Sequence, residues 1–271
     1  MTTMDGLVRG RVEGLRTEVR GAVLEITIAR PERRNALTPA LIGGLMDLLD
    51  RAQSHDGLRA VLLTGAGQKA FCAGFDIAMI DSPGAEVVGA ERDLVEDLAS
   101  AVVALPVPVV AAINGAAVGA GCDLAVACDI RVGTSSSRFG MPPARLGILY
   151  GWKGVDRLVR SIGLPAAKEL LLTGQLIDAS RAYDLGLISA VVPAGALLDE
   201  ARAVTDTLAA NAPLSVAASK RMTDLLSAGA GLRDDALSEL ASIQQRVWTS
   251  DDAAEGARAY RERRPPQFTG S

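Results

Sequence analysis

Residues 107–150 read VPVVAAINGAAVGAGCDLAVACDIRVGTSSSRFGMPPARLGILY. The apolar run 107–113 predicts a buried strand, and the small residues 114–120 predict a turn that leads through Gly119 into a helix. A further strand is predicted at 129–133. A turn of glycine and alanine lets a ligand approach the main chain, and the first N–H groups of a helix have no intrahelical partner. This corner can therefore stabilise a developing negative charge.

A second corner of the same kind lies earlier in the chain. The sequence FCAGFD, residues 71–76, follows a short apolar strand predicted at 60–64. Two strand-to-helix corners can each direct one main-chain N–H at a single oxygen atom, which is how an oxyanion hole is built. The alternative for this segment is an ordinary tight connection in which Asp76 accepts hydrogen bonds from main-chain donors.

The composition is that of a large globular domain, with or without an appendage: 271 residues, 49% hydrophobic and 22% charged. A net charge of −4 gives no basic field for nucleic acid, and no run of 18 apolar residues predicts a membrane span. Cys72, Cys122 and Cys128 lack paired spacing, which favours buried thiols in a cytoplasmic protein and no metal site. The single histidine, His55, is predicted in an exposed loop, so a Ser-His-Asp or Cys-His mechanism is not supported.

Strands alternate with helices through the first two-thirds of the chain. We expect a hairpin at 15–29, a helix at 39–53 capped by Thr38, and a helix at 86–105. This order predicts an α/β core of repeated ββα-like units. After Tyr150 the pattern is helical, with one short strand at 187–192. The predicted helices are 152–162, 165–172, 178–185, 195–210, 213–228, 232–248 and 251–263.

Six segments follow one another at characteristic spacing: ITIARPERRNAL (26–37), VLLTGAGQKAFCAGFDI (61–77), INGAAVGAGCDLAVACDIRV (113–132), FGMPPARLGILY (139–150), KELLLTGQLIDASRAYDLGLISAVV (168–192) and APLSVAASK (212–220). Together they resemble the crotonase, or enoyl-CoA hydratase/isomerase, superfamily. The resemblance implies a crotonase-like spiral of ββα units at 1–195 that carries the CoA site. It also implies a C-terminal helical region at 196–271 used to assemble a homotrimer or a dimer of trimers.

The resemblance further implies an acyl-CoA thioester as substrate, with coenzyme A carried as part of that substrate and no separate cofactor. By position, the N–H groups of Phe75 and Ala120 would form the oxyanion hole around the thioester carbonyl. The residues implied to bind CoA are Arg33, Arg34, Ala36, Ala73, Gly74, Asp76, Ile77 and Gly119. Within this set the arginines would lie near the CoA phosphates, unless they are simply solvated charges, and the alanines and Ile77 would line the adenine pocket.

The resemblance breaks at the two acids of a standard hydratase, which holds water between two glutamates. Asp123 stands at the first position, and Pro143, which has no ionisable group, stands at the second. Hydration needs a base for water and a proton source for carbon, so isomerisation or decarboxylation is favoured over the standard mechanism. Asp123 is the predicted proton-transfer group. Its alternative role is that of a first-turn acid that complements the helix dipole.

Tyr150 is the second predicted catalytic residue. The segment RLGILYG resembles the methylmalonyl-CoA decarboxylase branch of the superfamily, which has a tyrosine at this position. That branch has other residues where Phe75 and Asp123 stand, so the likeness is partial. The alternative is a buried aromatic whose hydroxyl pairs with the main chain. Two other functions stay open: a non-catalytic acyl-CoA binder and a non-standard enoyl-CoA hydratase.

Overall fold

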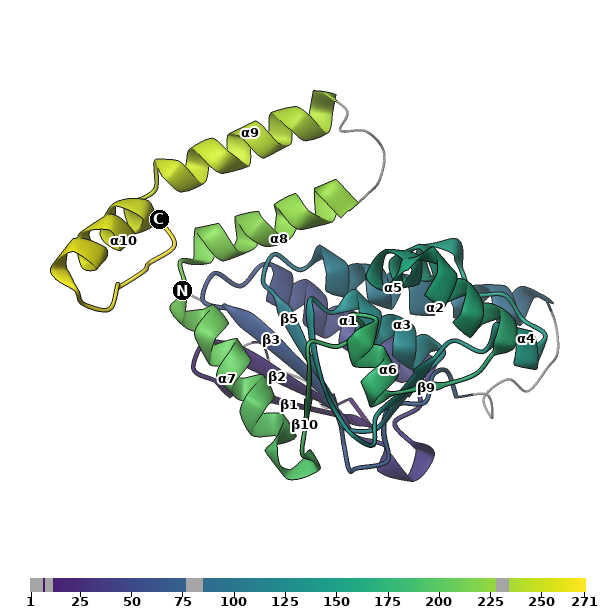
Figure 1. Ribbon diagram of the computed structural model, residues 1–271. Helices are drawn as coiled ribbons and strands as arrows, with labels where there is room; N and C mark the ends of the chain where they lie inside the picture. The colour runs from purple at the N-terminus through teal and green to yellow at the C-terminus, as the bar shows by residue number, and fades with distance from the viewer. Residues whose placement is uncertain (1–6, 8–11, 77–84, 228–233) are drawn as a thin grey trace.

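The computed structural model of the chain describes Leu7 and residues 12–76, 85–227 and 234–271 (Figure 1). Its strands form two sheets, one of six strands in the order β1-β2-β3-β5-β7-β10 and one of four in the order β4-β6-β8-β9. Helices cover both faces of the larger sheet, and the last helices extend away from it (Figure 1). The chain therefore has the predicted α/β fold with a helical C-terminal region.

The larger sheet begins with the predicted antiparallel hairpin and continues in parallel. Its strands are β1 (Leu15–Arg20), β2 (Val23–Ile28), β3 (Ala60–Gly65), β5 (Val109–Ile113), β7 (Ile130–Thr134) and β10 (Ala190–Val192). Every residue of β3 and β5 is buried, as is typical of parallel strands covered on both faces. The strand predicted at 107–113 starts two residues later because Pro108 has no N–H to donate to a ladder.

The smaller sheet consists of short strands: β4 (Ala70–Cys72), β6 (Ala116–Val118), β8 (Arg138–Gly140) and β9 (Ile177–Asp178). The prediction of a plain turn at 114–120 is wrong at its centre, which is β6. Pairing with β4 and β8 from distant parts of the chain makes this segment a strand. The first three of these strands each follow a long strand, so the predicted ββα unit appears as β3-β4-α2, β5-β6-α3 and β7-β8-α4.

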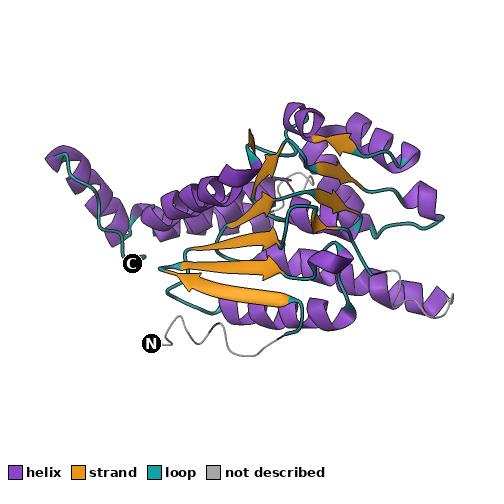
Figure 2. Ribbon diagram, turned by 90° about the horizontal axis from the view of Figure 1, so that it is seen from below, coloured by secondary structure: helices purple, strands orange, loops and turns teal. Residues whose placement is uncertain are grey.

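Three helices pack on one face of the larger sheet, α1 (Pro39–Gln53), α2 (Ala85–Ala104) and α3 (Ala120–Ala127), and α7 (Leu197–Ala210) packs on the other (Figures 1 and 2). Because successive strand residues face opposite sides, Val61 and Leu63 belong to the core beneath α1, and Leu62 belongs to the core beneath α7. Thr38 caps α1 as predicted, since its hydroxyl accepts a hydrogen bond from Leu41 N at 3.2 Å.

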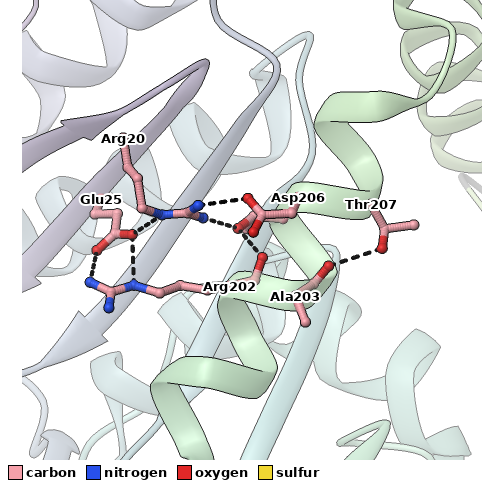
Figure 3. Close-up of polar contacts among 7 residues, drawn as sticks. Arg20, Glu25, Arg202, Ala203, Asp206 and Thr207 are labelled. Atoms are coloured by element: carbon pink, nitrogen blue, oxygen red, sulfur yellow. Dashed lines mark hydrogen bonds and ion pairs between the residues drawn. The ribbon is translucent and has the colours of Figure 1, made fainter.

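Ion pairs also hold α7 to the hairpin (Figure 3). Oε1 of Glu25, on β2, accepts hydrogen bonds from Nε of Arg20 at 2.8 Å and Nε of Arg202 at 2.9 Å. Oε2 accepts a further bond from Arg202 Nη2 at 2.7 Å, and Arg20 also donates to Asp206 at 2.7 Å. The helix is thereby fixed to the sheet by charge as well as by apolar packing.

The remaining helices are α4 (Pro143–Leu146), α5 (Trp152–Thr173), α6 (Ala179–Asp184), α8 (Pro213–Ser227), α9 (Asp234–Trp248) and α10 (Asp251–Glu262). The helices predicted at 152–162 and 165–172 are the two halves of α5, which kinks at Gly163, where φ is 78°. The C-terminal tail folds back on α10, because the Asp252 carboxylate accepts hydrogen bonds from Thr269 N at 2.7 Å and Gly270 N at 3.0 Å. Among the described helices, none combines the length and apolar character needed to cross a bilayer.

Candidate active site

The two predicted corners lie side by side. β4 and β6 run parallel, so the corner that follows each strand leaves at the same edge of the smaller sheet. A Cβ atom on Gly74 would lie 2.9 Å from Val118 O and 3.4 Å from Ala120 N, and a Cβ on Gly121 would overlap Cys72 O. Only glycine allows the main chains of the two corners to come this close.

Phe75 N and Ala120 N are the main-chain donors that these corners leave available. Within the described residues neither N–H donates a hydrogen bond, whereas the adjacent Asp76 N and Gly119 N donate to main-chain oxygens at 2.8 and 2.9 Å. Ala120 is the first residue of α3, whose N–H has no intrahelical acceptor. Its helical φ is negative, so the side chain adds no backbone strain. Both N–H groups can therefore bind an oxygen atom of a ligand.

Asp123 lies in the first turn of α3 and is 4% exposed. Both of its carboxylate oxygens accept hydrogen bonds from Arg157 on α5: Nε donates to Oδ1 and Nη2 donates to Oδ2, each at 2.9 Å. Such a bidentate pair fixes the orientation of the carboxylate. Gly154 makes room for this pair, because a Cβ there would lie 2.9 Å from Oδ2.

Tyr150 directly precedes α5 and is half-buried. Its hydroxyl lies against the corner at residues 114–120, 3.1 Å from where a Cβ on Gly119 would be. Burial, together with the neighbouring Cys122 and Asp123, raises the pKa of this hydroxyl above its usual value. In the described part of the chain the hydroxyl has no hydrogen-bond partner, so the alternative of a main-chain-paired tyrosine is wrong. Tyr150 is a neutral donor next to the corner, and Pro143 is a buried residue at the start of α4.

The structure places most of the predicted CoA-binding residues in or beside the corner at residues 71–76, where Ala73 N donates to Arg34 O. Arg33 and Arg34 are exposed and form no ion pair with any residue in the described ranges, so their charges are available to a ligand. Ala36 is buried and Ala73 is half-buried. Ile77 lies outside the described residues.

Sequence reasoning missed the residues that hold this segment together. Arg30 donates to Asp76 Oδ2 from two nitrogens at 3.1 Å and to Ala36 O at 2.7 Å. Buried Asn35 donates from Nδ2 to Ala66 O at 3.0 Å and to Ala70 O at 2.7 Å. Asp76 thus pairs with an arginine side chain, not with the main-chain donors of the alternative reading. The R-x-x-x-x-N spacing gave no signal, because Asp76, Ala66 and Ala70 lie 31–46 residues further along the chain.

Glu96, on α2, is a second acid that contacts the start of α5, and the sequence did not indicate it. Its carboxylate is half-buried, and Oε1 accepts a hydrogen bond from Lys153 N at 2.8 Å. A Cβ on Gly151 would lie 2.5–2.8 Å from the carboxyl atoms. The available signal was the pair of glycines at the start of α5, because Gly151, the N-cap residue, admits Glu96 and Gly154, in the first turn, admits Asp123.

The cysteines and the histidine contribute no reactive group to this site. Cys72, Cys122 and Cys128 are free and buried, and burial raises the pKa of each thiol to about 12. They stay protonated at neutral pH and are poor nucleophiles. His55 follows α1, and its Nδ1 accepts a hydrogen bond from Gly57 N at 3.2 Å. It is half-buried where the sequence predicts exposure.

Comparison with known proteins bears on this arrangement. A sequence profile of the family described as enoyl-CoA hydratase/isomerase matches residues 18–271. A Thermus thermophilus protein that is provisionally named an enoyl-CoA hydratase is 40% identical over 255 residues, which cover 92% of this chain and 98% of that protein. The carnitinyl-CoA dehydratase of Proteus mirabilis is 36% identical over 95% of this chain and 99% of its own. The crystal structure of an enoyl-CoA hydratase from Bacillus anthracis matches with a TM-score of 0.90 and 33% identity, over 96% of this chain and all of the other.

Proposed function

The chain belongs to the enoyl-CoA hydratase/isomerase family, and from that premise we propose that it acts on an acyl-CoA thioester through an enolate. Phe75 N and Ala120 N bind the thioester oxygen in this proposal. The observation that carries it is that these two N–H groups lie on adjacent corners without an acceptor in the described part of the protein. Donors that are already oriented need not reorganise when charge develops, and one such donor is worth about 10²–10³ in kcat.

The residues at the site favour isomerisation or decarboxylation over standard two-glutamate hydration. Asp123 is the proposed proton-transfer group and Tyr150 the proposed hydrogen-bond donor. Pro143 cannot hold or activate water, so the second glutamate of the standard mechanism has no equivalent at its position. The neutral hydroxyl of Tyr150, next to Gly119, suits a carboxylate or an enolate as acceptor.

A non-standard enoyl-CoA hydratase is the second candidate. The names of the relatives favour it, because several of them are hydratases or dehydratases of CoA thioesters. In that reaction the base for water would have to come from a residue other than Pro143. If the pairing of Asp123 with Arg157 prevents Asp123 from transferring a proton, the protein would bind acyl-CoA without catalysing a reaction.

The proposal also covers how the substrate and the protein are held. Arg33 and Arg34 would bind the CoA phosphates, and Ala36, Ala73, Gly74, Asp76, Ile77 and Gly119 would form the adjoining CoA surface. We propose a homotrimer or a dimer of trimers assembled through residues 196–271. Its location in the cytoplasm is inferred from the three free, buried thiols, which suit a reducing compartment.

The experiment is to offer purified protein crotonyl-CoA, a 3-enoyl-CoA and methylmalonyl-CoA. Hydration and decarboxylation are followed by the mass of the product, and isomerisation is followed by the ultraviolet absorbance of the conjugated 2-enoyl thioester, because it leaves the mass unchanged. We expect turnover of the second or third compound, and a loss of it in Asp123→Asn. Fast hydration of crotonyl-CoA that Asp123→Asn abolishes would reverse the order of the two candidates. CoA binding measured by calorimetry, without turnover of any thioester, would identify a binder.

A further inference from the structure

Three side chains, two from helices and one from the segment before α5, lie around the N-terminal end of α5. Glu96 of α2 bonds to Lys153 N, Asp123 of α3 bonds to Arg157, and Tyr150 directly precedes the helix and lies against Gly119. Two of them, Asp123 and Tyr150, belong to the site already described. Glu96 is therefore an additional acid beside the proposed reaction centre.

Two glycines at the N-terminal end of α5, Gly151 and Gly154, allow both carboxylates to approach the main chain. A Cβ on Gly151 would clash with the Glu96 carboxyl group, and a Cβ on Gly154 would lie 2.9 Å from Asp123 Oδ2. Gly151 is the N-cap residue of α5 and Gly154 lies in its first turn, so both are at the same end of the helix. Glu96 and Asp123 thus both contact the N-terminal end of α5, and Tyr150 directly precedes the glycine that Glu96 contacts.

The two carboxylates differ in what their oxygens do. Both oxygens of Asp123 are engaged by Arg157 at 2.9 Å. Glu96 uses Oε1 to accept from Lys153 N, and Oε2 has no partner within the described residues. Glu96 therefore has a carboxylate oxygen that no side chain or main-chain group in the described residues engages, whereas a proton can reach Asp123 only at an oxygen that Arg157 also binds.

We propose that Glu96 is the second proton-transfer group of this site and supplies the carboxylate that Pro143 lacks. The inference rests on the proposed function. In the isomerisation of a 3-enoyl thioester, Oε2 of Glu96 removes a proton from C2, and the electrons of the C–H bond form the enolate held by Phe75 N and Ala120 N. The enolate then re-forms the thioester carbonyl, a C2–C3 double bond replaces the C3–C4 double bond, and C4 takes the proton from Glu96 Oε2. No proton or electron is gained or lost overall.

Glu96→Gln tests this proposal because the amide oxygen still accepts from Lys153 N but cannot carry the proton. We expect kcat with a 3-enoyl-CoA to fall by about 10²–10⁴-fold, the contribution typical of a positioned general base. Deuterium uptake at C2 of a saturated acyl-CoA in D₂O should fall in parallel. In Glu96→Gln, the fall of kcat/KM at acidic pH that the wild type shows should be absent. The melting temperature and the CoA affinity of this variant should equal those of the wild type. Asp97→Asn, at the exposed next residue, is the matched control.

A purely structural role predicts a different result. If Glu96→Gln keeps the wild-type kcat and deuterium uptake, Glu96 only caps α5 and the proposal is wrong. If Glu96→Gln instead lowers the melting temperature, Glu96→Asp decides: it keeps the carboxylate, so it should retain the fall of kcat/KM at acidic pH, at reduced kcat. Loss of that fall in Glu96→Asp contradicts the proposal. Wild-type protein that neither turns over nor exchanges any thioester overturns the proposed function itself, a failure seen before any variant is made.

Discussion

The ion pair between Asp123 and Arg157 has side chains that are only 6% and 15% exposed. Removing one member leaves the other charge buried and unpaired. For Arg157→Ala we expect the free energy of unfolding to fall by about 3–5 kcal/mol, measured by chemical denaturation. The matched control is Arg160→Ala, which breaks the exposed Arg160–Asp156 pair on the same helix and should cost only about 0.3–0.5 kcal/mol. Equal losses in the two variants would contradict a special role for the buried pair.

The hydroxyl of Tyr150 should matter for activity and not for folding. It has no hydrogen-bond partner in the described residues, so Tyr150→Phe should leave the melting temperature unchanged and lower kcat. Because burial raises the pKa of this hydroxyl, it stays protonated above the usual tyrosine pKa of about 10. Plotted against pH, kcat/KM should therefore behave alike near pH 10 in the wild type and in Tyr150→Phe. A fall near pH 10 that is present in the wild type and absent in Tyr150→Phe is not expected. Such a fall would show that the tyrosine is not shielded.

At the residue scale the sequence predicts the main chain of the site better than its side-chain partners. Small residues at the ends of apolar strands indicated the corners at Phe75 and Ala120, because glycine and alanine are needed wherever main chains come close. The partners Arg30, Arg157 and Glu96 could not be predicted. Each reaches its partner across elements that are adjacent only in the folded chain.

At the scale of elements, the contact between the two corners leaves no space for a side chain. Gly121→Ala would push a Cβ into Cys72 O, so β4 and α3 must separate. We expect a loss of about 1–3 kcal/mol in the free energy of unfolding, the usual cost of overpacking. Gly43→Ala in α1, where a Cβ meets nothing within 4 Å, should instead stabilise the protein by about 0.5–1 kcal/mol. Thermal melts of both variants check the opposite signs.

The ion pairs of Glu25 with Arg202 and Arg20 should make the free energy of unfolding depend on pH. Burial alone would raise the pKa of Glu25, but hydrogen bonds from Arg202 and Arg20 lower it below the usual value of 4.5. A lowered pKa contributes stability that is present above about pH 4.5 and is lost as the pH falls through the folded-state pKa. Glu25→Gln should thus lower the melting temperature at pH 7 and flatten its dependence on pH in the acidic range. Glu18→Gln, at the exposed residue opposite on β1, should change neither.

The predicted and observed elements agree best where the sequence of a segment alone determines its structure. The hairpin, α1 with its Thr38 cap, and the buried strand β3 all show periodicity or capping within a few residues. The strands β4, β6 and β8 have three residues each and exist only as paired neighbours. No sequence window contains that pairing, so β6 was predicted as a turn.

At the scale of the whole molecule, α8, α9 and α10 project from the sheet-containing body (Figures 1 and 2). They carry large exposed apolar side chains, with Trp248 76% and Tyr260 87% exposed. Exposed apolar side chains are typical of surfaces that contact another protein chain, which supports the proposed assembly. We expect light scattering to give the mass of a trimer or a hexamer, and the double variant Trp248→Glu and Tyr260→Glu to shift it towards monomer. A monomeric mass for the wild type at all concentrations would contradict the expected assembly.

The position of α7 in the chain has a consequence for protein synthesis. The apolar cluster that includes Val23, Leu62 and Val132 is covered by Leu197 and Ala201. A ribosome adding about 5–20 residues per second needs roughly 3–13 s to extend the chain from Val132 to Leu197. During that interval α7 has not been synthesised, so the apolar face of the sheet that it covers is exposed. Ribosome-bound chains arrested before residue 197 should therefore recruit holding chaperones, and chains released after residue 210 should not.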